Sequence, residues 1–99
     1  MTHPLEKDLE YAVAMIAQSE IKFLSPMGPL ILAAAALEIA SDSRSFARIF
    51  GIAHALVIRE CVSLSEELHL IEPYKRADKS QRLFYDITEQ GWSIIPRDI

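Results

Sequence analysis

Two helical segments that meet at Gly51 constrain the fold of this 99-residue chain more than any other feature. Ser43 or Ser45 can cap a short helix that runs to Phe50, because a serine hydroxyl accepts a free amide hydrogen of the first turn. Gly51 then ends this helix, since glycine takes the left-handed backbone conformation at little cost. A longer helix from about Ala53 to Leu68 follows, with apolar residues spaced four, three and four positions apart: Val57, Cys61, Leu64 and Leu68.

The residues around the glycine predict that these two helices cross closely. Ala47 is small at the crossing, so the two backbones can approach each other. The larger apolar side chains of the segment are then expected to point into the core: Phe46, Phe50, Ile52 and Val57. The front of the second helix stays free to enter a DNA major groove, which is about 12 Å wide. The side chains expected on that front are Ala53, His54, Ala55, Ile58 and Arg59.

A β-hairpin pattern follows the second helix. Residues 70–74 predict a short strand in which Pro73 requires an edge or irregular position, and residues 76–81 are polar, as in a turn. Residues 82–87 alternate between two sets of side chains with the period of two that is typical of a return strand. Thr88 or Asp86 can cap a last short helix, which Pro96 limits. The hairpin tip is basic, with Lys75, Arg76, Lys79 and Arg82.

The N-terminal part predicts two further helices. The first runs from Pro4 to about Leu24 and carries one apolar or small stripe: Leu5, Leu9, Ala12, Ile16, Ser19 and Phe23. This stripe either packs on its own domain or forms a dimer seam through Leu5, Leu9, Ala12 and Ile16, and both readings can hold. Ser25 as N-cap and Pro26 at the first helical position begin the second helix, whose residues 30–37 are all apolar and therefore buried. We expect an N-terminal arm of residues 1–24 and a domain of residues 25–99.

This order of elements predicts a mainly α fold with a small β-hairpin (α+β), a winged helix-turn-helix preceded by an N-terminal helix. Leu24-Ser25-Pro26, residues 45–52, residues 67–72 and residues 83–91 together resemble the winged-helix regulators of the MarR type. The resemblance covers about residues 24–95, and its most specific positions are Ala47, Gly51 and Val57. It implies a DNA-binding transcriptional regulator of a short form that lacks the long C-terminal dimerisation helix. It leaves the small-molecule effector, if one exists, unknown.

Charge is distributed unevenly along the chain. The formal net charge is −4 and the isoelectric point is about 5.3, yet residues 43–85 alone carry +2. Arg59 is the best candidate for reading a base, because an arginine can bond a guanine edge through two donors at once. The bases of the hairpin tip are expected to lie along phosphates or in a minor groove. The full set of predicted DNA-contacting residues is Arg44, Arg48, His54, Ala55, Ile58, Arg59, Lys75, Arg76, Lys79 and Arg82.

A second function stays open beside double-stranded DNA binding by a homodimer. The acidic net charge and Glu60, which stands where a helix-turn-helix usually has an apolar residue, favour a winged helix that binds another protein without DNA. Exposed Ile58 and Phe84 favour the same alternative.

The sequence argues against other classes of protein. It contains no metalloprotease, nucleophile-elbow or phosphate-cradling glycine motif, so we expect no enzymatic activity, cofactor or metal site. The single cysteine, Cys61, lies on the apolar stripe of its helix and is expected to be a buried, inert thiol. With no disulfide possible within the chain and no signal peptide or membrane span in the sequence, we expect a cytoplasmic protein.

Overall fold

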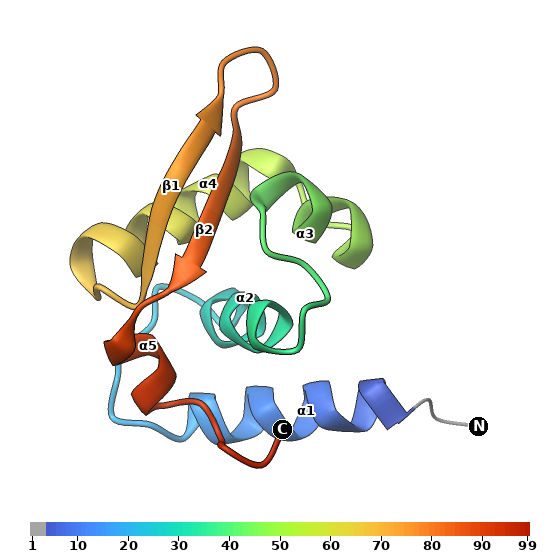
Figure 1. The fold of residues 1–99 in the computed structure, drawn as a ribbon, viewed down its shortest axis with the longest axis vertical. Helices are drawn as coiled ribbons and strands as arrows, with labels where there is room; N and C mark the ends of the chain where they lie inside the picture. Colours follow the sequence, from blue (N-terminus) through green and yellow to red (C-terminus); the bar gives the residue numbers. More distant parts are fainter. Residues whose placement is uncertain (1–3) are drawn as a thin grey trace.

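The computed structural model describes residues 4–99, with side chains from Glu6 onward, and has the predicted α+β fold. Figure 1 shows the hairpin rising past the helix-turn-helix pair at one end of the molecule, while the N-terminal helix lies beneath the second helix at the other. The elements are α1 (Pro4–Ala17), α2 (Met27–Ala36), α3 (Ser43–Phe50), α4 (His54–Val62), the π-helical turn η1 (Ser63–Glu67), β1 (Ile71–Ala77), β2 (Arg82–Ile87) and α5 (Glu89–Ser93). The winged helix-turn-helix preceded by an N-terminal helix is confirmed.

Helix α1 packs on α2 and ends earlier than predicted. It stops at Ala17 instead of continuing to about Leu24. The ring of Phe23 lies against Gly28 of α2, where any Cβ would collide with it. Phe23 therefore packs on α2 and does not continue the stripe of α1.

The predicted stripe of α1 is enclosed within one chain. Ala12 and Ile16 have no exposed surface and join the core shared with the rest of the fold, and Leu9 packs against that core. The side chain of Leu5 lies outside the described residues. Because Ala12 and Ile16 are covered by their own chain, they are not available to a second subunit, and α1 is part of one packed unit with residues 25–99. The reading of this stripe as a helix packed on its own domain is the one the structure supports.

Helix α2 occupies the centre of the fold. The hydroxyl of Ser25 accepts the N–H of Met27 at 3.1 Å, which caps the helix start as predicted, and Pro26 has helical backbone angles. Ile31, Leu32 and the alanines beside them are buried, which explains the uninterrupted apolar run of this segment.

The helix-turn-helix forms at the predicted glycine, but its cap is a different residue. Gly51 has left-handed backbone angles of φ 65° and ψ 37° and ends α3. Ala47 and Val57 are buried between the two helices and the core. The cap of α3 is Asp42, whose carboxylate accepts the N–H of Ser45 at 2.9 Å. Ser43 does not cap the helix because its hydroxyl bonds to other elements, as described below.

Helix α4 is shorter than the predicted span to Leu68, because the chain widens into η1 after Val62. The N–H of Leu68 bonds to the carbonyl of Ser63, five residues back, and His69 then takes a left-handed conformation. The wider turn gives the helix one extra residue per turn and so changes which side chains face the core. Cys61, Ser63 and Leu64 are all buried around this point.

The hairpin is longer than predicted, and α5 closes it. Strands β1 and β2 pair antiparallel from Ile71 and Ile87 to Ala77 and Arg82, with an irregularity between Pro73 and Lys75. Strand pairing thus includes Lys75 and Arg76, and the turn is confined to residues 78–81. Thr88 caps α5 by accepting the N–H of Gly91 at 3.0 Å.

Candidate nucleic-acid interface

A polar junction joins the start of α3 to strand β2. The guanidinium of Arg82 donates to both carboxylate oxygens of Asp42, at 2.7 Å and 3.1 Å, and to the hydroxyl of Ser45 at 3.0 Å. Burial raises the pKa of Asp42, but the hydrogen bonds from Arg82 and Ser45 lower it more, to about 2. Arg82 also lies over the ring of Phe84, 5.1 Å from its centroid.

These contacts give Arg82 a structural role besides the predicted one. Its Nε and one terminal nitrogen donate inside the chain, and its charge is matched by the buried carboxylate of Asp42. The guanidinium thus holds the hairpin to α3, while the side chain stays 37% exposed, so phosphate contact by Arg82 stays a prediction. No local sequence pattern indicates this pair, since its two members are 40 residues apart.

His54 takes part in the same junction. Its Nε2 lies 2.8 Å from the hydroxyl of Ser43, which in turn accepts the N–H of Leu83 at 2.9 Å. Burial lowers the pKa of His54 below its ordinary value, and the positive charges of Arg44 and Arg76 lower it further against the opposing charge of Asp42. His54 thus links the start of α4 to α3 and β2. Its Nε2 is engaged there and is not a free group on the front of the helix.

Exposed basic side chains lie on α3, α4 and the hairpin. Arg44 of α3 donates to the backbone carbonyl of Ser80 in the hairpin turn, at 3.0 Å, so α3 and the hairpin tip are adjacent. The ammonium of Lys75 lies 5.6 Å from the centroid of the Phe84 ring. We define the basic face as Arg44, Arg48, Arg59, Lys75, Arg76 and Lys79, all of which are exposed.

None of the side chains of the basic face forms an ion pair with a described carboxylate. Within residues 4–99 the one ion pair closer than 4 Å is that between Asp42 and Arg82. The six cations of the basic face therefore keep their charge available at the surface.

The exposed side of α4 is more apolar than the sequence reading supposed. Ala55 and Arg59 are exposed as predicted, while Ile58 is half-buried. Leu56 and Val62, which were not among the predicted site residues, are 52% and 40% exposed. Leu56 lies three residues before Arg59 and Val62 three residues after it, which could have placed them on the same helical face. The exposed surface of α4 thus carries one positive charge, that of Arg59, surrounded by aliphatic side chains.

Glu60 and Cys61 face inward. Glu60 is only 2% exposed, and one of its carboxylate oxygens accepts the hydroxyl of Ser25 at 2.6 Å. Cys61 is fully buried, and burial together with the nearby charge of Glu60 raises its pKa to about 12. The thiol is protonated at neutral pH, so the expected buried thiol is confirmed and its chemistry is that of a small apolar side chain.

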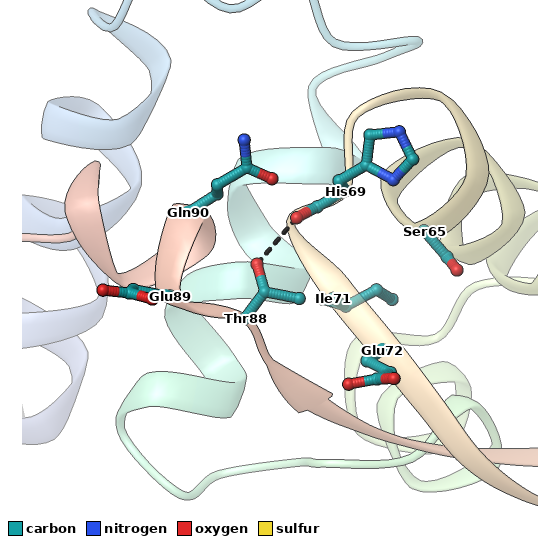
Figure 2. A pocket seen from close by; sticks show the side chains of 7 residues that line it. All are labelled: Ser65, His69, Ile71, Glu72, Thr88, Glu89 and Gln90. Carbon is teal, nitrogen blue, oxygen red and sulfur yellow. Dashed lines mark hydrogen bonds between the residues drawn. The ribbon is translucent and has the colours of Figure 1, made fainter.

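A separate hollow of about 510 Å³ lies at the base of the hairpin, away from the turn, and its lining is shown in Figure 2. Thr88 closes one side of it by donating its hydroxyl hydrogen to the carbonyl of His69 at 2.7 Å. His69, Glu72 and Glu89 also line it, but the described residues contain no group of three or more side chains suited to hold a metal ion. Nothing in this hollow indicates a ligand class.

The chain matches no protein-family model, no curated protein and no solved structure. None of the helices within residues 4–99 combines the length and the apolar character that crossing a bilayer requires.

Proposed function

We propose that this protein is a cytoplasmic DNA-binding transcriptional regulator with a winged helix of the MarR type. Helix α4 enters the major groove with Arg59 as the base-reading residue, beside Ala55 and Ile58. The hairpin is the wing, and Lys75, Arg76 and Lys79 contact the phosphate backbone.

The observation that carries this proposal is the contact between Arg44 and the wing turn. The bond from Arg44 to the carbonyl of Ser80 joins the cations of α3 to those of the wing, so one surface gathers positive charge in a protein whose net charge is −4. Phosphate contacts depend on such a local concentration of charge and not on the net charge of the molecule.

Fluorescence anisotropy with a labelled duplex at several salt concentrations tests the proposal. The operator is first selected from a random duplex pool at near-physiological salt. We expect the affinity to fall with salt, and the triple variant Lys75→Ala, Arg76→Ala, Lys79→Ala to reduce the log–log salt slope by about one unit per lost contact. A matched control replaces Lys7 and Lys22, which are exposed but lie outside the basic face. Salt-independent binding, or equal losses in the control, would count against the proposal.

We also propose that the regulator is a homodimer, because paired recognition helices about 34–36 Å apart meet successive major grooves. Since Ala12 and Ile16 are enclosed, contact through α1 uses the neighbouring side of the helix, where Tyr11 and Met15 are 44% and 42% exposed. Sedimentation of the variant Tyr11→Lys, Met15→Lys is expected to show a monomer. An unchanged dimer removes α1 from the interface, and a monomeric parent protein refutes the proposal.

The apolar side of α4 supports one alternative, a winged helix that binds another protein. Leu56 and Val62 are exposed on the helix that DNA binding requires to be at the surface, and they bring no charge to it. The two functions separate in one experiment. Duplex binding that persists in Leu56→Lys but is lost in Arg59→Ala supports DNA, whereas a protein without DNA affinity whose copurifying partner is lost in Leu56→Lys supports the alternative.

A further inference from the structure

A small hollow separates the segment that precedes α2 from helix α4. Its volume is about 290 Å³, which is the lower end of the range for small-molecule sites in proteins. The residues that line it are Leu24, Ser25, Met27, Leu56, Arg59 and Glu60. Most of this lining is apolar, and the buried carboxylate of Glu60 is its one acidic group.

The carboxylate of Glu60 has an unmet hydrogen-bonding capacity. Its Oε1 accepts the Ser25 hydroxyl, but its Oε2 is buried and has no partner among the described residues. Ser25 cannot supply a second bond, because its single hydroxyl hydrogen goes to Oε1 while its oxygen accepts the N–H of Met27. A buried acceptor without a donor is uncommon in folded proteins and calls for a group that the chain does not provide.

We propose that this hollow binds a small apolar molecule that carries one protonated amine, with the ammonium group bonded to Oε2 of Glu60. A carboxylate accepts hydrogen bonds, and an ammonium group supplies both a donor and the opposite charge. Leu24, Met27 and Leu56 contact the apolar body of the ligand. Arg59 at the same hollow disfavours a second positive charge on the ligand, so a monoamine fits better than a diamine.

Access to Glu60 requires one rim side chain to move. Oε2 is covered by protein atoms. Leu24 and Leu56 are about half exposed, and Met27 is an unbranched, adaptable side chain, so these rim residues are the ones whose rotation the proposal requires. The hollow shares Arg59 with the proposed DNA interface, but binding of the amine can be tested without nucleic acid.

Two-dimensional ¹H–¹⁵N NMR of the ¹⁵N-labelled protein tests this site with three probes of similar shape. These are 2-phenylethylamine, 2-phenylethanol and ethylbenzene, each titrated to millimolar concentration. We expect the amine to shift the amide resonances of residues 24–28 and 56–60. The alcohol, which has a donor without charge, is expected to bind roughly tenfold more weakly, and the hydrocarbon more weakly still.

Three variants connect the binding to Glu60. Glu60→Gln keeps the side-chain length and an oxygen for Ser25 but removes the charge, so we expect the amine to bind at least about tenfold more weakly. Glu66→Gln is the matched control, since Glu66 is exposed on η1 and does not line the hollow. Leu56→Trp fills the hollow from an exposed position and is expected to abolish binding in a folded protein, which keeps the test valid should Glu60→Gln unfold.

Three results would contradict the proposed amine site. If millimolar amine leaves the resonances of the hollow unchanged, a fixed water molecule satisfies Oε2 and the proposal is wrong. It is also wrong if 2-phenylethanol binds as tightly as the amine, or if Leu56→Trp or a folded Glu60→Gln retains full affinity.

Discussion

Among the described side chains, from Glu6 onward, two carboxylates are buried, those of Asp42 and Glu60, and they differ in how completely they are bonded. Asp42 receives two hydrogen bonds from Arg82 and one from the N–H of Ser45. Glu60 receives one, from the uncharged hydroxyl of Ser25, and keeps one oxygen without a partner. The first arrangement stabilises the contact between helix and wing, while the second costs stability that a ligand can restore. Burial of an acidic group therefore goes with a stabilising contact at Asp42 and with a loss of stability at Glu60.

The largest difference is expected on removing each carboxylate. Asp42→Ala removes the cap of α3 and leaves the Arg82 guanidinium without its partner, so we expect a loss of about 3 kcal/mol in the free energy of unfolding. Urea denaturation followed by circular dichroism measures it. Asp86→Ala, at an exposed carboxylate of the same hairpin, is the control and should change stability little. A loss below about 1 kcal/mol for Asp42→Ala would show that the pair is not a stabilising contact.

The stability that Asp42 contributes is expected to depend on pH, because folding lowers the pKa of its carboxyl group. Because this pKa is about 2 in the folded protein and ordinarily 3.8, the unfolded chain binds the proton more readily. The contribution of Asp42 is present above pH 3.8 and is lost as the pH falls toward 2, by up to about 2 kcal/mol. Urea denaturation at several pH values measures it. In Asp42→Asn this part of the pH dependence should disappear, and its persistence would assign the loss to other carboxylates.

Replacing Glu60 should act in the opposite direction to replacing Asp42. Glu60→Met removes the incompletely bonded carboxylate and fills its space with an apolar side chain of similar length. We expect the free energy of unfolding to rise by about 1 kcal/mol, because the cost of burying the charged group disappears. Thermal and urea unfolding check the sign. A clear loss of stability would mean that Glu60 is fully bonded in solution.

His54 gives the smallest expected effect. Its pKa is lowered from the ordinary 6.5, so the folded state disfavours the charged imidazole. The stability that neutral His54 contributes is present above pH 6.5 and is lost as the pH falls below this value. His54→Gln should flatten the curve of unfolding free energy between pH 7 and 5.5. His69→Asn, at an exposed left-handed position that asparagine tolerates, should leave the curve as it is in the parent protein.

Local sequence rules predicted the start of α2, the end of α3 and the start of α5. The serine and proline at 25 and 26, Gly51 and Thr88 act through the backbone of their own turns, and each has the expected role. The rules were less successful where two candidates compete within one turn. Asp42 caps α3 instead of Ser43 or Ser45, because strand β2 and α4 engage the hydroxyl of Ser43.

The candidate site was predicted less completely than the fold. Exposure of Arg44, Arg48, Arg59, Lys75, Arg76 and Lys79 agrees with the prediction, since charged side chains on turns and helix surfaces remain in water. The internal role of Arg82 and the apolar front of α4 were missed. Both depend on which segment lies beside each residue, and side-chain type alone does not contain that information.

The sequence by itself determined the order of helices and strands, the turn at Gly51 and the alternation of the wing, because these follow from backbone conformation and short-range periodicity. Tertiary structure decided which partners the buried polar groups have. Arg82 meets Asp42 across 40 residues and Glu60 meets Ser25 across 35, and no local pattern relates either pair. Charge and hydrogen-bonding capacity are properties of a residue, but whether they are satisfied depends on the neighbours that folding brings within about 3 Å.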